Sequence, residues 1–283
     1  MISVLSAEAT KLLRHRATWF LVWIYPLGMI AVFFIALMLD FFGAGEAPSE
    51  PQTAEGWVRD SAVIWQLATS NFGRFLIAAY AAVAIAGEYG WNTWKLIVPH
   101  RARRALLGSK LITVFALLYL GLGLAGLLTA GLSWVQDRLT GDSIPDGVTL
   151  AAVLEMQGLA ALATLLPMLF TLAYAALAAV LTRSMVATLV IAIVVGTAEQ
   201  LFTAYAGIFY PSAPGLISAL YHFLPGYHLA NLIEWIVEGQ GMDVALPGGG
   251  GPLGWQASLA VAGGWAAGLI ALTLWRFQRQ DIN

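Results

Sequence analysis

The chain has 283 residues, of which 59% are hydrophobic and only 11% are charged, and its mean hydropathy is +0.77. Soluble globular domains carry roughly 25% charged residues, so this composition indicates a membrane protein with several spans and excludes an ordinary soluble enzyme. The net charge of −2 says little about partners, whereas the absence of cysteine excludes disulfides, thiolate nucleophiles and iron–sulfur sites.

The N-terminal segment 1–16 is predicted to form a short amphipathic helix at the membrane surface. Ile2, Leu5, Ala9 and Leu12 recur at spacings of three and four, and the segment ends in basic residues. The alternative is an ordinary basic flank that orients the first span. The apolar run that follows is too long for the core of a signal peptide, so we expect it to be retained.

Six apolar segments are long enough to cross a membrane, which predicts an all-α membrane protein with six transmembrane helices. The expected spans cover about 18–42, 62–86, 111–134, 158–181, 185–210 and 255–275. No internal repeat is evident. The acidic segments 43–61 and 135–157 are expected to be outer loops.

The distribution of basic residues predicts the orientation of these spans. Eleven fall on one side, Arg59 and Arg138 fall on the other, and Arg74 lies within a span. Basic residues close to membrane spans stay on the cytoplasmic side, so both termini are expected in the cytoplasm. The eleven residues are Lys11, Arg14, Arg16, Lys95, Arg101, Arg103, Arg104, Lys110, Arg183, Arg276 and Arg279.

Residues 211–254 are too polar to span a membrane, yet too apolar for a free loop. Two short helices, broken at Leu224-Pro225-Gly226, fit this pattern best. We expect residues 211–240 to form a re-entrant hairpin that enters the outer leaflet from outside, where protein must cover any non-helical backbone.

The segment 87–110, GEYGWNTWKLIVPHRARRALLGSK, carries five of the fourteen Lys and Arg residues. Trp91, Trp94, Leu96 and Ile97 offer an apolar face of the kind that anchors protein interfaces. Alternatively, the tryptophans belong to an interfacial belt and the basic residues only set the topology.

In this segment an apolar helix is followed by a small residue and Glu-Tyr, and then by a Thr, an apolar turn, an Arg and a Lys. This pattern resembles the cytoplasmic loop of ABC-2-type transporter permeases. The N-terminal helix resembles the elbow helix of that family, and the six spans and late hairpin resemble it too. The resemblance therefore covers nearly the whole chain, 1–283, as one transmembrane domain. The matching loop residues are Gly87, Glu88, Tyr89, Thr93, Leu96, Arg101 or Arg104, and Lys110.

The resemblance implies that loop 87–104 is a coupling helix that docks into a separate ATP-binding subunit. It also implies two copies of that ATPase, which would carry ATP and Mg, and a second permease protomer, identical or homologous. The complex would be an exporter in the lipid of the bacterial plasma membrane, with no nucleic-acid partner. The residues expected to contact the ATPase are Glu88, Tyr89, Trp91, Asn92, Thr93, Trp94, Lys95 and Arg101.

The chain itself has no Gly-Lys pair for a phosphate-binding loop, so we expect no nucleotide on it and no catalytic role. The alternatives are a secondary carrier that works without ATP and a structural subunit of a membrane complex. A carrier usually has paired broken helices in two related halves, which are not evident here. An intramembrane enzyme would need motifs such as H-E-x-x-H or G-x-S-x-G, and neither occurs.

Arg74 and Glu199 are the two ionisable residues deepest in the predicted spans. At ~1.5 Å per helical residue both lie roughly 18–21 Å from the cytoplasmic side. Charges in lipid are costly and usually paired, so we expect an ion pair between spans two and five. The alternatives are that each faces water or the other protomer, or contacts substrate.

Two further groups are weaker candidates. His222, His228, Glu234 and Glu238 fit no tight metal-binding pattern, so no metal site is expected. Gly264 and Gly268 form a G-x-x-x-G that allows close helix approach, either within the protomer or between protomers.

Overall fold

The computed structural model describes residues 2–42, 52–141 and 144–281, and this part of the chain is helical without any strand. Residues 43–51 of the predicted outer loop 43–61, and 142–143 of the predicted loop 135–157, lie outside the described residues. The prediction of a loop is wrong for 135–140 and 150–157, which are helical because the two flanking helices extend beyond their apolar stretches. Six helices are long and apolar enough to cross a membrane, which confirms the predicted all-α fold with six spans. They are α3 (Ile24–Phe41), α5 with its extension (Asn71–Gly90), α8 (Arg103–Thr140), α9 (Leu150–Thr182), α10 with its last turn (Met185–Ser212) and α13 (Trp255–Gln278).

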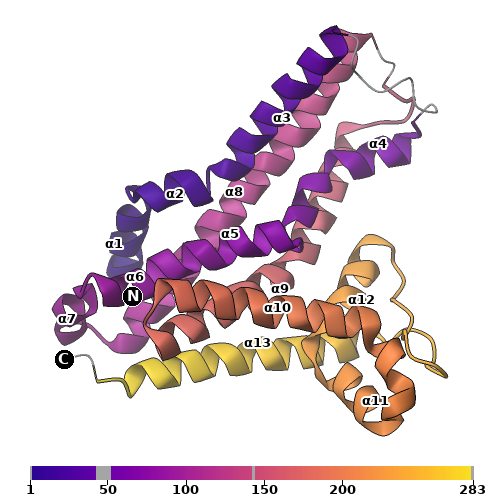
Figure 1. The fold of residues 1–283 in the computed structure, drawn as a ribbon. Coiled ribbons are helices and arrows are strands. Elements are labelled where there is room, and N and C mark those ends of the chain that lie inside the picture. Colours follow the sequence, from indigo (N-terminus) through magenta and orange to yellow (C-terminus); the bar gives the residue numbers. More distant parts are fainter. Residues whose placement is uncertain (1, 43–51, 142–143, 282–283) are drawn as a thin grey trace.

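The first span is shorter than predicted. Residues before it form two separate helices, α1 (Ile2–Leu13) and α2 (Arg16–Leu21), and α3 begins only at Ile24. His15 caps α2, since its Nδ1 accepts a hydrogen bond from the Ala17 amide at 3.1 Å. Figure 1 shows α1 and α2 bent away from α3. The helix predicted over 1–16 is therefore followed by a second short helix, α2, before the first span begins.

The second span is not the continuous helix predicted over 62–86. The chain instead forms α4 (Ala54–Ser61), a 3₁₀ segment (η1, Val63–Ala68) and then α5 (Asn71–Ala81). Ser70 adopts an extended conformation, and its hydroxyl accepts a hydrogen bond from the Gly73 amide at 3.1 Å. A Cβ at Gly73 would lie 1.7 Å from the Leu67 carbonyl oxygen, so only glycine fits this break. A π-helical turn (η2, Ala82–Ala86) and α6 (Gly87–Gly90) complete the span.

Helix α9 is the centre of the bundle. Helices α5, α8, α10, α12 and α13 all pack against it, and two thirds of its most apolar stretch is buried within the chain. By contrast, only about a sixth of the corresponding stretch of α3 or α10 is buried. Helices α3 and α8 lie side by side and diverge from α10 and α13 (Figure 1). The outer faces of α3 and α10 are thus left to lipid or to another subunit.

The bundle has two chemically different ends. The basic end carries α1, α6, α7 (Thr93–Ile97), a short 3₁₀ turn (η3, Val98–His100) and both termini, as Figure 1 shows. The opposite end, which we call the acidic end, carries α4, α11 (Pro214–Phe223) and α12 (Pro225–Val237), with a 3₁₀ turn (η4, Tyr210–Ser212) between α10 and α11. Two helices broken at Leu224 therefore occur where the sequence predicts a hairpin; its depth in the membrane stays a prediction.

The hairpin is fixed to α13 by a buried hydrogen-bonded cluster. The Asn231 side chain donates to Ser258 Oγ at 2.8 Å and to the Leu253 carbonyl at 2.9 Å. His228 Nε2 lies 2.8 Å from the His222 carbonyl, and its Nδ1 lies 3.1 Å from Ser258 Oγ. These contacts give both imidazole nitrogens a structural role. Among the described residues no group of three His, Asp or Glu side chains could hold a metal ion.

Candidate functional site

The basic end is shaped by a sharp turn between α6 and α7. Asn92 adopts a left-handed conformation (φ 57°), which Asn tolerates better than most residues. The reversal turns α7 away from the axis of the second span. Pro99 then lies in the short 3₁₀ turn, and Arg101 is extended before α8 starts at Arg103. The result is a short helix that projects from the end of the bundle (Figure 1).

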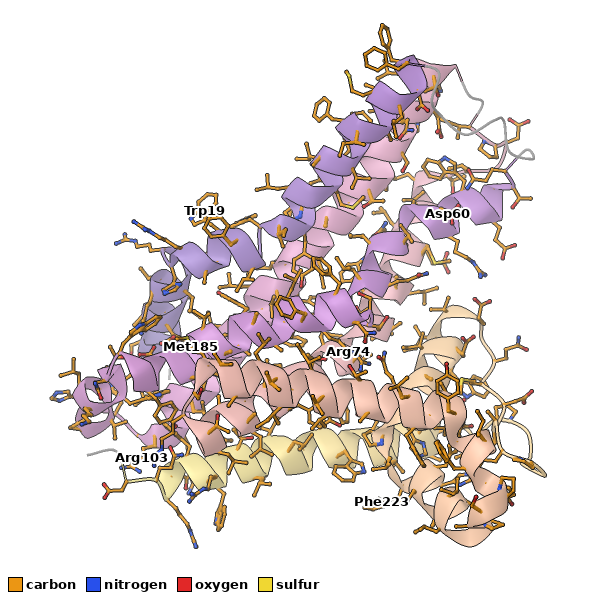
Figure 2. The ribbon with its side chains drawn as sticks, in the orientation of Figure 1. Trp19, Asp60, Arg74, Arg103, Met185 and Phe223 are labelled. Carbon is orange, nitrogen blue, oxygen red and sulfur yellow. The ribbon has the colours of Figure 1, made fainter. Side chains whose placement is uncertain are left out.

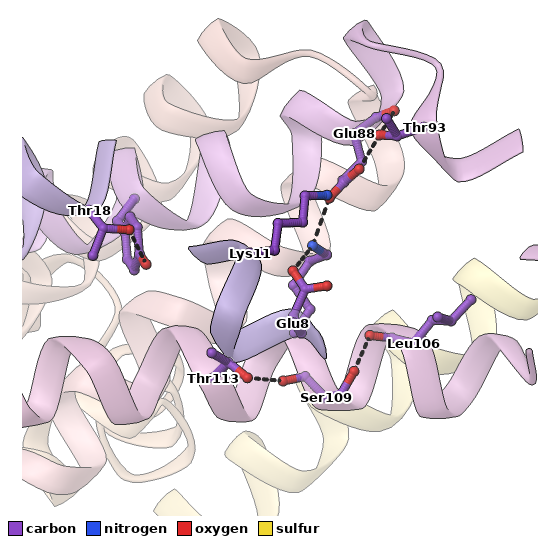
Figure 3. Close-up of polar contacts among 10 residues, drawn as sticks. Glu8, Lys11, Thr18, Glu88, Thr93, Leu106, Ser109 and Thr113 are labelled. Carbon is purple, nitrogen blue, oxygen red and sulfur yellow. Dashed lines mark hydrogen bonds and ion pairs between the residues drawn. The ribbon is translucent and has the colours of Figure 1, made fainter. Parts of the chain in front are cut away.

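Beneath this turn lies a network of four charged side chains (Figure 3). The Glu88 carboxylate is 1% exposed and pairs with Lys110 of α8 at 2.8 Å and with Lys11 of α1. Lys110, also 1% exposed, pairs in addition with Glu8 of α1. The Thr93 hydroxyl of α7 donates to the Glu88 carboxylate. The network therefore joins α1, α6, α7 and α8 through one buried carboxylate.

The two acids and two bases of this network balance one another. Burial of an ion pair costs desolvation free energy that further hydrogen bonds must offset, as the Thr93 hydroxyl does here. Removing one partner leaves an uncompensated charge, which typically costs about 3–5 kcal/mol. The arrangement of the four elements is thus specified by charge as well as by apolar packing.

A second set of contacts ties the same turn to the C-terminal segment. The Trp94 side chain is 1% exposed, and its ring lies 4.7 Å from that of Phe277 in α13. Tyr89 donates to Gln280 Oε1 at 2.6 Å, and the Gln280 amide donates to the Val180 carbonyl. Arg103 of α8 donates to the Gln278 carbonyl at 2.9 Å. A displacement of α7 must therefore also move the ends of α9 and α13.

The exposed part of α7 and its flanks forms a mixed apolar and basic surface, which we call the α7 face. Leu96 is 69% exposed and Trp91 is 50% exposed, although the Trp91 ring contacts His15 at 5.6 Å. Its exposed members are Trp91, Asn92, Lys95, Leu96, Arg101 and Arg104. Beside it a cavity of about 210 Å³ is lined by Tyr89, Asn92, Trp94, Lys95 and Arg183, among others.

The structure thus divides the eight residues predicted to contact an ATPase into two groups. Trp91, Asn92, Lys95 and Arg101 are exposed and available to a partner. Glu88 and Trp94 are buried, and Tyr89 and Thr93 are partly buried with partners inside the chain. Docking by these residues stays a prediction, and the buried ones are placed to position the turn rather than to touch a partner.

Sequence reasoning missed several members of this site. Glu8 and Lys11 are three residues apart on one helix and so lie on the same face, which is a signal for a polar contact opposite the apolar stripe. Gln280 and Phe277 carry no such signal, because their partners Tyr89 and Trp94 are far away in the sequence. Only the folded chain brings them together.

Arg74 and Glu199 lie in one polar cluster but do not form the expected ion pair. Arg74 Nη1 donates to the Gly196 carbonyl of α10 at 2.9 Å, and Tyr174 of α9 donates to Glu199 Oε2 at 2.8 Å. Within the described residues Arg74 Nε and Glu199 Oε1 are buried without a hydrogen-bond partner. Each charge is held by a third group, so the direct salt bridge is absent while α5, α9 and α10 are still linked. Figure 2 labels Arg74 between the ribbons of α5 and α10.

The glycine pair of the last span does not mediate packing within the chain. A Cβ built at Gly264 or Gly268 would meet no atom within 4 Å. Both glycines instead line an open apolar cavity of about 480 Å³ on α13, together with Phe223 and Trp265. The two alternatives for this glycine pair are close helix approach within the protomer and between protomers. The structure does not show the first of them.

Comparison with known proteins agrees with this architecture. No curated protein and no solved structure matches the chain significantly. The family model of the ABC-2 family transporter protein matches residues 4–199, well over half of the chain, from α1 through the α7 face to the middle of α10. The match and the six spans make this a multi-pass membrane protein and a membrane transport component of the ABC type. The chain belongs to the ABC-2 family of transporter proteins.

Proposed function

We propose that this chain is the permease subunit of an ATP-driven exporter and that a separate ATP-binding subunit docks on the α7 face. The observation that carries the proposal is the contrast within α6–α7: its outer residues are exposed and apolar or basic, whereas its inner residues are locked by buried ion pairs. An exposed Leu and Trp on a rigid turn suit an interface anchor. ATP and Mg would be bound by the partner.

The proposed coupling follows from the contacts behind the face. A force applied at Trp91 or Leu96 reaches Glu88 through the turn, and from there Lys110 of α8 and Lys11 of α1. The Trp94–Phe277 contact passes the same displacement to α13. Five helices, α1, α6, α7, α8 and α13, would therefore move together when two ATPase subunits close, and the spans would carry the motion toward the acidic end.

We further propose that the basic end is cytoplasmic and that a second permease protomer, identical or homologous, completes the transport pathway in a bacterial plasma membrane. The excess of Lys and Arg at one end supports the orientation. The largely unburied faces of α3 and α10 support a partner protomer. Arg74 and Glu199, on α5 and α10, would contribute polar groups to the pathway.

Co-purification tests this proposal. Tagged chain is isolated in mild detergent from its native membrane, and every bound protein is identified and assayed for ATP hydrolysis. We expect an ATPase in stoichiometric amount, lost in the variant Leu96→Glu. Leu139→Glu is the matched control, because Leu139 is 64% exposed but lies at the far end of α8.

Two results would contradict the proposal. One is that the chain purifies alone, or only with proteins that do not hydrolyse ATP, under conditions that preserve other transporters. That result would favour a secondary carrier or a structural subunit. The other is that Leu96→Glu retains the ATPase as well as Leu139→Glu does, which would place docking elsewhere.

A further inference from the structure

Helices α8 and α13 both pack on α9, and an apolar groove runs between them along the surface of α9. Near the basic end it forms a cavity of about 360 Å³, lined by residues such as Gly108 and Leu111 of α8 and Leu274 of α13. Toward the acidic end it widens to about 810 Å³, between α9, α12 and α13. Phe115 and Leu169 line both cavities, so the two cavities adjoin along one apolar surface, which we call the groove.

The chemistry of the groove selects what can fill it. Its lining is aliphatic and aromatic, with no charged side chain in either cavity. The one indole N–H from α12, that of Trp235, donates to the Leu253 carbonyl at 3.0 Å. Trp255 of α13 also lines the wider cavity, and its indole N–H is a single further donor. A polar ligand would therefore lose most of its hydrogen bonds to water without replacement. A hydrocarbon chain from the surrounding bilayer gives up no hydrogen bonds on entering, and only its ordering opposes binding.

A positive charge lies at the end of the groove that is nearer the basic end of the bundle. Arg104, Gly108, Leu111 and Phe115 are spaced by four, three and four residues, so they form one stripe along α8. Arg104 is exposed, one helical turn beyond the point where the apolar lining ends at Gly108. A guanidinium in this position matches a phosphate, which it can bind in a bidentate manner.

We propose that this groove is a binding site for an anionic phospholipid, with one acyl chain lying along Gly108, Leu111 and Phe115 and the phosphate held by Arg104. Charge complementarity at the inner mouth and the purely apolar lining above it favour a lipid over a polar solute. The site shares Arg104 with the edge of the α7 face, but its apolar lining lies elsewhere and it does not depend on the proposed export function. The lipid would fill the space between α8 and α13 and so restrain their separation.

Gly108 offers a variant that blocks the site without disturbing the fold. A Cβ at Gly108 meets no atom within 4 Å, so Gly108→Leu places its side chain in open groove space. Leucine also favours a helix more than glycine does, and loss of folding is therefore not expected. Gly131→Leu is the matched control, since Gly131 lies on the same helix with equally open surroundings but does not line the groove.

The test is native mass spectrometry of the full chain in mild detergent, with added phosphatidylglycerol or phosphatidylcholine that carry identical acyl chains. Wild type and Gly131→Leu are expected to retain phosphatidylglycerol in preference, and Gly108→Leu is expected to lose these adducts. Arg104→Gln should lower phosphatidylglycerol retention about fivefold, toward the level of phosphatidylcholine, because one basic contact to an anionic headgroup is removed. Arg101→Gln, an exposed residue off the stripe, should leave the preference unchanged.

Two outcomes would overturn the proposal. The first is equal retention of the two lipids by wild type, and the second is unchanged lipid binding in Gly108→Leu. If Gly108→Leu leaves lipid binding unchanged and also converts a dimer to a monomer, the groove is assigned to a second copy of the chain. Size-exclusion profiles of all variants show whether each is folded, and therefore whether its mass spectrum reports on the site.

Discussion

Lys110 and Glu88 form an ion pair of 2.8 Å between α8 and α6, and each side chain is only 1% exposed. Each also has a second partner of opposite charge from α1, namely Glu8 for Lys110 and Lys11 for Glu88. The pair therefore cannot separate without moving three helices. The α7 face lies directly outside this pair. The Thr93 hydroxyl, which donates to Glu88, and the Trp94 ring, over which Lys110 lies at 5.6 Å, link α7 to the buried electrostatic network.

Substituting Lys110 with Met tests how much this network contributes to stability. The change retains volume but leaves Glu88 and Glu8 close together with only the half-exposed Lys11 as counter-charge. We expect the free energy of unfolding to fall by about 3–5 kcal/mol. Thermal unfolding in detergent measures this, with Lys95→Met as the exposed control, expected within ~0.5 kcal/mol of wild type. Equal melting temperatures for the two variants would refute a structural role for the network.

Gly73→Ala tests the break in the second span. The added methyl group would lie 1.7 Å from the Leu67 carbonyl oxygen, which belongs to backbone and cannot move aside. We expect a loss of more than about 4 kcal/mol and little folded protein. Gly263→Ala is the matched control, since a methyl group added there would have no atom within 4 Å, and it should be neutral or stabilise by up to ~1 kcal/mol. The yield of monodisperse protein is the readout; a normal yield for Gly73→Ala would show that the break is not needed.

These two sites show what the sequence could and could not predict. Hydropathy and charge asymmetry predict six spans and place both termini at one end, because both signals add up over many residues. The break at Ser70 depends on one glycine and one serine cap within an apolar run, so the hydropathy of 62–86 still resembles a single span. At this position local hydrogen bonding, and not the mean hydropathy of the segment, determines the backbone conformation.

The candidate site was predictable in position but not in its internal arrangement. The motif residues of loop 87–104 do cluster, since they lie close together in the sequence. The burial of Glu88 depends on Lys110 and Lys11, which approach it from two other helices. Likewise, the depth of Arg74 and Glu199 in the bundle follows from residue counts. Their partners, Gly196 and Tyr174, depend on how each helix is rotated about its own axis, which the local sequence does not encode.

His228 gives the acidic end a dependence on pH. Its Nε2 must donate to the His222 carbonyl, so in the neutral ring Nδ1 accepts from the Ser258 hydroxyl. Burial lowers the pKa of His228 below its ordinary value. The hydrogen bond to the His222 carbonyl acts against this shift and the charge of the His222 ring acts with it, but burial is the largest of the three effects. The unfolded chain binds the proton more readily, at a pKa of about 6.5. The stabilisation that neutral His228 gives to the folded chain is therefore complete above about pH 6.5 and declines as the pH falls below that value.

The measurement is the melting temperature of detergent-purified protein at pH 7.5 and at pH 5.5. We expect a drop on acidification for wild type and a smaller drop for His228→Gln, whose amide can donate and accept at the same positions without titrating. His100→Gln, an exposed residue at the basic end, should retain the full drop. If His228→Gln loses as much stability as wild type, the effect belongs to other groups.

A double-mutant cycle on Arg74 and Glu199 tests whether the two charges act together. Each is held by a third group rather than by the other, yet both have a buried atom without a partner and Arg74 binds the carbonyl of Gly196, one turn from Glu199. Removing either charge alone leaves the opposite charge uncompensated in the bundle, so Arg74→Gln and Glu199→Gln should each destabilise. Removing both should cost less than the sum of the two single losses, with a coupling of about 0.5–3 kcal/mol.

Strict additivity within ~0.5 kcal/mol would mean that the two charges are independent. Tyr119→Phe paired with Glu199→Gln is the control cycle, because Tyr119 donates to the Ala161 carbonyl and has no contact with Glu199.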